Sequence, residues 1–225
     1  LNNKKFTIPI GISIAKTNCQ ETVGTEKAIL DYFKAYKAFT NIGDYFTLNI
    51  SCPNAFGSQP FTDNLKLNAL LEKIMSIPKN KPIFIKLSPD LSKKEVDEII
   101  NTAGKWKIDG FICTNLTKNR ANKNIIDENV PKVGGFSGKV LNNLTDKLIQ
   151  YVYKKTKGKF VIIGVGGVSS AVDAYKKIKK GASLVQLITG MIFEGPQVIS
   201  DINLGLAKLL KADGYKNISE AIGKE

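Results

Sequence analysis

A short polar segment at the end of an apolar run carries the side chains best suited to chemistry. Asn49, Cys52 and Asn54 lie at or just beyond the end of the run at residues 45–50, and the run breaks at Pro53. An amide offers both a donor and an acceptor. A free thiol has a pKa of about 8.5, and its thiolate can act as a nucleophile or a general base. The segment predicts a ligand site with Cys52 as proton acceptor; turn-forming asparagines and a structural thiol are the plain alternatives.

Other apolar runs end in similar residues. Lys86 lies near the end of the run at 82–87, and Thr114 and Asn115 end the run at 108–114. A buried lysine needs an anionic or electron-rich partner, so Lys86 could stabilise negative charge on a reduced ring cofactor. A strand-end lysine that reaches solvent is the alternative. Amides such as that of Asn115 suit a flat heterocycle with alternating C=O and N–H groups.

Two glycine-containing turns predict a phosphate site. Gly166 and Gly167 lie in the turn after one apolar run, and Thr189 and Gly190 follow the next one. Glycines let backbone N–H groups approach a phosphate, and a helix that follows offers its positive end. Ordinary turn glycines are the alternative, but two such turns in consecutive units favour the phosphate interpretation.

The elements that position these residues alternate between strands and helices. We expect strands at residues 6–14, 45–50, 82–87, 108–114, 160–164 and 184–188, and helices at 25–39, 64–76, 93–103, 142–156, 169–179 and 197–210. Thr25 is the expected cap of the first helix, and Ser92 with Glu95 forms a capping box before the third. This order predicts parallel strands covered by helices.

Two folds have this order of elements. One is a doubly wound sheet, and the other is a (β/α)8 TIM barrel that lacks roughly its first two βα units. Paired phosphate-binding turns after the last two strands are typical of the barrel, which we therefore favour. We expect a single domain over residues 1–225, the C-terminal three quarters of such a barrel.

Composition limits the remaining possibilities. The chain has 225 residues, 43% of them apolar, and no apolar run reaches the length of about 18 residues that a membrane span needs. It has no His, and its three cysteines have no metal-ligand spacing and suit a reducing cytoplasm. The net charge is +13, but Arg120 is the only arginine, and lysines are spread over helical segments such as 176–180. We expect solvated basic faces, with no metal and no nucleic-acid partner.

Six phrases of the sequence, taken in order, resemble the dihydroorotate dehydrogenase family of flavin enzymes. They are NISCPN at 49–54, IKLSPDL at 85–91, DGFICTN at 109–115, GGFSG at 134–138, IIGVGG at 162–167 and GASLVQ at 181–186. Each phrase is weak alone, but the ordered set runs through nearly the whole chain and is specific. The resemblance implies an FMN-binding (β/α)8 barrel that oxidises dihydroorotate to orotate in de novo pyrimidine (UMP) biosynthesis.

The resemblance implies a role for each matching polar residue. Asn49 would touch both FMN and substrate, and Asn54 and Asn115 would hold the pyrimidine. Cys52 falls where the family places its general base. That base would take a proton from C5 of the substrate while hydride leaves C6 for flavin N5.

The same likeness implies the flavin contacts. The residues that would contact FMN or lie along its phosphate are Lys86, Thr114, Gly138, Gly166, Gly167 and Thr189, with Gly190 next to the last of them. A further flavin-contacting asparagine of the family aligns with Thr17 or, after a slip of one residue, with Asn18.

The phrases mix two classes of the family. Several phrases resemble the membrane-associated, quinone-reducing class 2, which usually has Ser as its base. They are SPDL, TN, FSG and the tail at 213–223. Cys52 is similar to the base of the soluble class 1, and Leu116 stands where class 2 has a second Thr. We expect class 2 with a cysteine base and a quinone as electron acceptor, with fumarate and NAD as the other options. We expect a cytoplasmic protein with peripheral contact to the inner face of the cell membrane through an N-terminal segment.

The family pattern has two further βα units before the part that this sequence matches. Without them, six strands cannot close an eight-strand barrel, and weak FMN binding is expected. Two other functions fit the residues. One is another FMN barrel that acts on a pyrimidine, similar to dihydropyrimidine dehydrogenase or dihydrouridine synthase, although the latter would favour a basic groove with more arginine. The other is a non-catalytic phosphate-binding barrel fragment.

Overall fold

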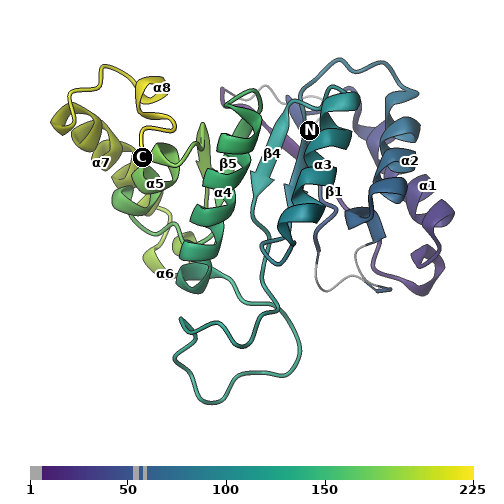
Figure 1. The fold of residues 1–225 in the computed structure, drawn as a ribbon, viewed down its shortest axis with the longest axis horizontal. Helices are drawn as coiled ribbons and strands as arrows, with labels where there is room; N and C mark the ends of the chain where they lie inside the picture. Colours follow the sequence, from purple (N-terminus) through teal and green to yellow (C-terminus); the bar gives the residue numbers. More distant parts are fainter. Residues whose placement is uncertain (1–6, 53–55, 58–59) are drawn as a thin grey trace. The chain divides into compact units, whose positions relative to one another are not determined.

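The computed structural model of the chain describes residues 7–52, 56–57 and 60–225. Strands and helices alternate along it, as Figure 1 shows. Contacts group the chain into two compact units, one made of residues 1–87 and 91–110 and the other of residues 88–90 and 111–225. Each unit is described by itself. The expectation of a single functional domain stays a prediction.

The first unit contains three parallel strands and three main helices. The strands are β1 (Gly11–Ile14), β2 (Tyr45–Leu48) and β3 (Ile83–Leu87), in that order across the sheet. The helices are α1 (Thr25–Phe39), α2 (Asn64–Met75) and α3 (Lys93–Lys105), with short 3-10 turns at Gln20–Thr22 (η1) and Pro60–Thr62 (η2). The parallel register pairs Ile14 with Leu48 and Leu48 with Ile85, so the three strands end at one edge of the sheet.

The second unit repeats the same order. Its strands are β4 (Gly110–Cys113), whose first residue belongs to the first unit, β5 (Val161–Val165) and β6 (Leu184–Gln186). Its helices are α4 (Asn142–Thr156), α5 (Ala171–Lys179), α6 (Thr189–Glu194), α7 (Val198–Ala212) and α8 (Ile218–Ala221), with a 3-10 turn η3 at Gly138–Leu141. β5 and β6 pair in parallel, and the backbone N–H of Thr114 donates to Val165 O at 2.8 Å.

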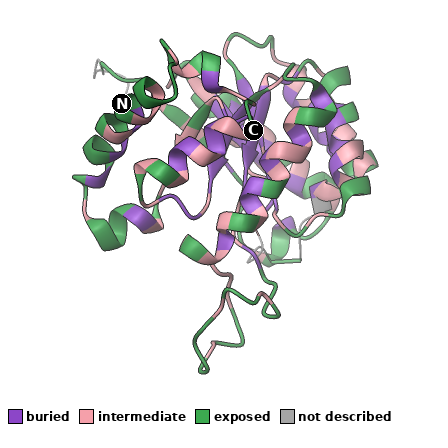
Figure 2. Ribbon diagram, turned by 60° about the vertical axis from the view of Figure 1, so that its left-hand side comes forward, coloured by how far each residue is buried: buried purple, intermediate pink, exposed green. Residues whose placement is uncertain are grey.

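Apolar side chains on the strands and on the strand-facing sides of the helices form the cores. Figure 2 colours the ribbon purple at all buried residues. In the first unit, Tyr32 and Tyr36 are 2% and 1% exposed and pack edge-on against Phe61 and Phe46. In the second unit, Cys113 is fully buried at the end of β4. Burying apolar surface at about 25 cal/mol per Å² is the main driving force for this packing.

Side-chain caps begin about half of the described helices, namely α2, α3, α5 and α8. The capping box of Ser92 and Glu95 is confirmed before α3, and Asp63 and Ser170 cap α2 and α5 through their side chains. The expected cap of α1 was wrong, because Thr25 is already helical and Gly24 holds the N-cap position.

Element bounds differ from the expected ones at strand ends and at one short helix. Most of the observed strands are shorter than the apolar runs, and several residues left outside them, such as Ile50, Ile108 and Ile188, are themselves apolar. α6 was not predicted at all. Its apolar residues Ile192 and Phe193 are 70% and 82% exposed, so it lacks the one-sided pattern that marks a surface helix.

The long loop between β4 and η3 extends away from the helices of the second unit (Figure 1). Arg120, the only arginine, holds it together: its guanidinium donates to Pro131 O at 3.0 and 3.2 Å and to Gly134 O at 3.1 Å. The same group lies 5.2 Å from the centre of the Phe136 ring. Arg120 therefore serves the loop's own structure.

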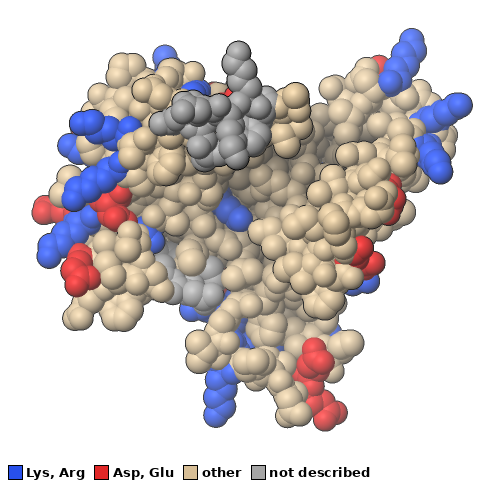
Figure 3. Space-filling model, turned by 180° about the vertical axis from the view of Figure 1, so that it is seen from behind, with Lys and Arg blue, Asp and Glu red and all other residues tan. Residues whose placement is uncertain are grey.

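Basic side chains on the face drawn in Figure 3 lie mainly along its edges, with acidic side chains among several of them. This agrees with solvated basic faces for most lysines. Lys177, whose side chain is fully buried, and Lys16, which is 9% exposed, are exceptions, and Lys86 is half-buried. Within the described residues, no helix has both the length and the apolar character that crossing a bilayer requires.

Candidate functional site

Asn49 lies directly after β2, and neighbouring residues of the first unit hold it in place. Its N–H donates to Ile14 O at 2.8 Å, and its carbonyl oxygen accepts from the Tyr32 hydroxyl at 2.8 Å. Its side-chain Oδ1 accepts from the Ser51 hydroxyl at 3.2 Å. The backbone of Asn49 is thus fixed from both sides, and its amide is oriented by a local turn.

Cys52 and Lys86 are both half-buried and lie close enough to interact electrostatically. Burial lowers the pKa of Lys86, and the Cys52 thiolate opposes that shift. Among the described residues, no carboxylate forms an ion pair with Lys86. Buried lysines that serve only the structure are usually paired with a carboxylate. Lys86 has no such partner among the described residues and lies near the thiol of Cys52, which points to a functional role.

The segment after β1 also reaches this region. The Lys16 ammonium donates to Phe56 O, and Asn18 Oδ1 accepts from Phe56 N at 2.6 Å. Thr17 instead bonds to Asp31, through its N–H at 2.7 Å and its hydroxyl at 2.9 Å. The sequence interpretation missed Lys16, although a lysine directly after an apolar strand is the same signal as Lys86. Asn54 lies outside the described residues.

Thr114 occupies the corresponding strand end in the second unit. It is 2% exposed, and its hydroxyl lies 3.0 Å from the hydroxyl of Thr145, which in turn donates to Val165 O at 3.3 Å. The Cys113–Thr114 peptide bond is cis. Asn115 Oδ1 accepts from Leu116 N at 2.9 Å, so part of its amide serves a local turn. Sequence reasoning missed Thr145, because a threonine inside an amphipathic helix gives no local signal.

The predicted glycines of the second unit come together at close packing distances. A Cβ built on Gly138 would meet Thr189 Cγ2 at 3.0 Å, and one on Gly190 would lie 2.2 Å from Val168 O. The Thr189 hydroxyl donates to the Ser137 hydroxyl at 2.9 Å. The turns at 137–138, 166–168 and 189–190 are therefore neighbours, as the phosphate interpretation requires.

Gly166 and Gly167 also need to be glycine for conformational reasons. Their φ angles are +125° and +74°, in the region that L side chains rarely adopt. A Cβ on Gly166 would meet Thr145 Oγ1 at 2.6 Å, and one on Gly167 would meet Asn142 Cβ at 2.7 Å. A turn with positive φ angles next to a helix start presents backbone N–H groups in a concave arrangement, which is a common anion site.

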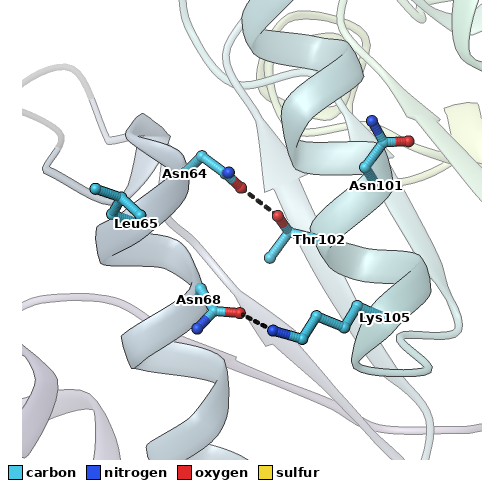
Figure 4. A pocket seen from close by; sticks show the side chains of 6 residues that line it. All are labelled: Asn64, Leu65, Asn68, Asn101, Thr102 and Lys105. Atoms are coloured by element: carbon cyan, nitrogen blue, oxygen red, sulfur yellow. Dashed lines mark hydrogen bonds between the residues drawn. The ribbon is translucent and has the colours of Figure 1, made fainter.

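A shallow groove of about 350 Å³ lies elsewhere in the first unit, between α2 and α3. Figure 4 shows its lining: Asn64 accepts from the Thr102 hydroxyl, and Asn68 accepts from Lys105 Nζ at 3.0 Å. None of the lining residues belongs to the predicted site, and Asn64, Thr102, Asn68 and Lys105 form hydrogen bonds in these two pairs. In the part of the chain that is described, no group of three or more His, Cys, Asp or Glu residues could hold a metal ion.

Comparisons with known proteins assign this chain to a family. The family model for dihydroorotate dehydrogenase matches residues 1–210. The chain is 42% identical over 221 residues to a dihydroorotate dehydrogenase (quinone) of Sulfurimonas denitrificans, covering 98% of this chain and 60% of that protein. It is 37% identical over 236 residues to the Trichodesmium erythraeum protein of the same name, covering 99% and 61%.

A solved structure gives the same answer for the fold. The ligand-free DHODH of Eimeria tenella is 29% identical, with a TM-score of 0.88 over 96% of this chain and 64% of that one. The chain spans about 60% of the length of the curated relatives it matches. The fold is that of the (β/α)8 barrels of this family, to which the six parallel strands and their helices correspond, and the expected barrel is confirmed. This chain belongs to the dihydroorotate dehydrogenase family.

Proposed function

We propose that this chain carries the oxidation of dihydroorotate to orotate, with FMN as cofactor and a quinone as the final electron acceptor. Membership of the family supports the reaction class. The observation that carries the proposal is that Cys52, after β2, and the half-buried Lys86, near the end of the neighbouring strand β3, lie close enough to interact electrostatically. This arrangement places an ionisable thiol beside a desolvated ammonium that has no carboxylate partner among the described residues.

In this proposal Cys52 is the general base. Its thiolate takes the proton from C5 of dihydroorotate, and the electron pair of that C–H bond forms the new C5=C6 double bond as hydride leaves C6. FMN, when bound, accepts that hydride. Ser51 is a poorer base, because it is fully buried and its hydroxyl donates to Asn49 Oδ1.

Lys86 and Asn49 bind rather than transfer protons. The Lys86 ammonium supplies positive charge for an electron-rich ring, and its lowered pKa reflects the burial that this role requires. Asn49 presents an amide whose backbone is fixed by Tyr32 and Ile14. Asn54 and Asn115 would hold the carbonyl and N–H groups of the pyrimidine.

The residues of the second unit fit a phosphate monoester such as that of FMN. At Gly138, Gly166, Gly167 and Gly190 a Cβ would crowd or overlap a neighbouring protein atom, so only glycine fits these turns, and their backbone N–H groups would bind the phosphate. Thr189 adds a hydroxyl, and Thr114 lies at the end of β4 with its hydroxyl oriented by Thr145. These residues would hold the phosphate and one edge of the cofactor.

The names of the relatives support the proposed acceptor and location. Three curated relatives that are 36–42% identical to this chain carry the name dihydroorotate dehydrogenase (quinone). A quinone that resides in a lipid bilayer would require peripheral contact with the membrane surface. Both points are part of the proposal.

The experiment begins with the absorbance of the purified chain after addition of FMN. A bound-flavin spectrum and reduction of that flavin by dihydroorotate are the expected results. Cys52→Ala should remove the reduction and keep the flavin bound, while Cys52→Ser should keep a slower rate that rises with pH. Cys19→Ala is the matched control, because Cys19 is also partly exposed and free. Unchanged reduction in Cys52→Ala would refute the base, and the absence of any flavin binding would refute the function.

A further inference from the structure

The Asn142 side chain, at the first residue of α4, joins the glycine turn of the second unit to two helices. Its Nδ2 donates to Gly167 O at 3.3 Å and to Asp173 Oδ1 at 2.9 Å. Its Oδ1 accepts from Lys177 Nζ at 3.4 Å. A Cβ on Gly167 would lie 2.8 Å from Asn142 Cα, so the turn also packs directly on the backbone of this residue.

The chemistry of these partners allows only one orientation of the amide. A backbone carbonyl and a carboxylate are acceptors, so they must face the NH2 group. An ammonium is a donor without acceptor capacity, so it must face Oδ1. Lys177 thereby selects the orientation in which Asn142 donates to Gly167.

Lys177 itself is fixed by a buried ion pair. Its ammonium is fully buried and lies 2.7 Å from Asp146 Oδ1, while Lys176 lies 3.0 Å from Oδ2 of the same carboxylate. Gly164 makes room for the lysine stem, since a Cβ there would meet Lys177 Cδ at 3.3 Å. Burial lowers the pKa of Lys177, and the Asp146 carboxylate opposes that shift. A charge pair this well enclosed has few alternative positions.

Asp173 holds the other side of the same turn. Its Oδ2 accepts from Ser169 N at 3.2 Å, from the Ser169 hydroxyl at 3.2 Å and from the Ser170 hydroxyl at 2.8 Å. Residues 167–170 are thus tied to α4 through Asn142 and to α5 through Asp173. Hydrogen bonds from two helices therefore fix the backbone of residues 167–170, which would face a phosphate.

We propose that Asn142, oriented by the buried Lys177–Asp146 pair, is a positioning residue that fixes the glycine turn at 166–168 for recognition of the cofactor phosphate. The inference rests on the proposed function for the identity of the ligand. Its structural part, the fixing of the turn, concerns the chain alone.

The first experiment compares FMN with riboflavin, which lacks the phosphate. Asn142→Leu keeps the size of the side chain and removes its hydrogen bonds without adding charge. We expect the ratio of FMN affinity to riboflavin affinity to fall at least about tenfold, which corresponds to about 1.4 kcal/mol. Asn143→Leu is the matched control, because Asn143 is exposed on the same helical turn, and it should change the ratio less than about twofold. An unchanged ratio, whether both affinities fall equally or neither changes, would overturn the positioning role.

The second experiment needs no ligand. Amide hydrogen exchange of the whole chain should become at least about tenfold faster at 166–170 in Asn142→Leu, with little change in β6. Lys177→Met should act in the same direction, and Lys147→Met, which removes the same charge from an exposed position, should not. Unchanged exchange at the turn would contradict the inference. If the native chain binds neither flavin, the proposed function fails while the exchange result still decides the fixing of the turn.

Discussion

Tyr32→Phe isolates one hydrogen bond beneath the candidate site. The Tyr32 hydroxyl donates to Asn49 O at 2.8 Å, and the side chain is only 2% exposed. Phenylalanine keeps the ring and its edge-on contact with Phe61 at 5.3 Å, so little apolar burial is lost. What is lost is the donor to a carbonyl at the end of β2, where Ile50 and Ser51 are also buried.

The magnitude follows from this geometry. A typical hydrogen bond contributes about 1 kcal/mol, and a buried acceptor left without a donor costs about 1–3 kcal/mol. Water has poor access to a site covered by a side chain that is 2% exposed. We therefore expect Tyr32→Phe to lower the free energy of unfolding by about 1–2 kcal/mol.

Urea unfolding with linear extrapolation measures this difference. Tyr36→Phe is the matched control: Tyr36 is 1% exposed and packs on Phe46 at 4.9 Å, and its hydroxyl makes no hydrogen bond to any described residue. That control should cost less than about 0.5 kcal/mol. Equal effects of the two substitutions would show that the Asn49 carbonyl does not depend on Tyr32, and the account of how this strand end is fixed would be wrong.

Two further substitutions probe the glycine turn. Gly167→Ala should destabilise the chain more than Gly214→Ala and remove FMN binding, because both positions have positive φ angles of +74° and +78° but only Gly167 would place a Cβ 2.7 Å from Asn142; urea unfolding and flavin fluorescence measure the two effects. Asp173→Asn should flatten the loss of stability in acid. Burial alone would raise the pKa of Asp173, but hydrogen bonds from Ser170, Ser169 and Asn142 outweigh it and hold the pKa below 3.8. The native carboxylate therefore stabilises the fold above that pH and loses this contribution as the pH falls through its lowered pKa. Parallel curves for the two chains between about pH 5 and pH 2 would contradict this.

The order of elements could be read from the sequence because each has a local signal. The apolar spacing gave the bounds of α1 and α4 as they are observed, and the serine and glutamate before α3 form the expected capping box. Parallel strands place their carboxyl ends at one edge of a sheet. For this reason Asn49 and Lys86 could be assigned to one site from the sequence alone. The strand-end glycines could be grouped for the same reason.

The hydrogen bonds and ion pair around the glycine turn, made by Asn142, Asp146 and Lys177, could not be predicted in this way. Lys177 lies in a run of lysines that looks like a solvated face, yet it is fully buried against Asp146. Its partner is 31 positions away in the sequence, and periodicity carries no information about a pairing at that distance. Asn142 and Thr145 likewise look like ordinary polar positions of an amphipathic helix. Their roles depend on which strand the helix covers.

The burial of Cys113 gives the chain a built-in reporter. All three cysteines are free, but Cys19 and Cys52 are partly exposed, whereas Cys113 is fully buried and burial raises the pKa of its thiol. A thiol-reactive dye would label the first two in the folded chain and reach Cys113 only when the strand that carries it opens. The labelling rate of this one sulfur atom would therefore time the opening of the second unit, separately from the chemistry at Cys52.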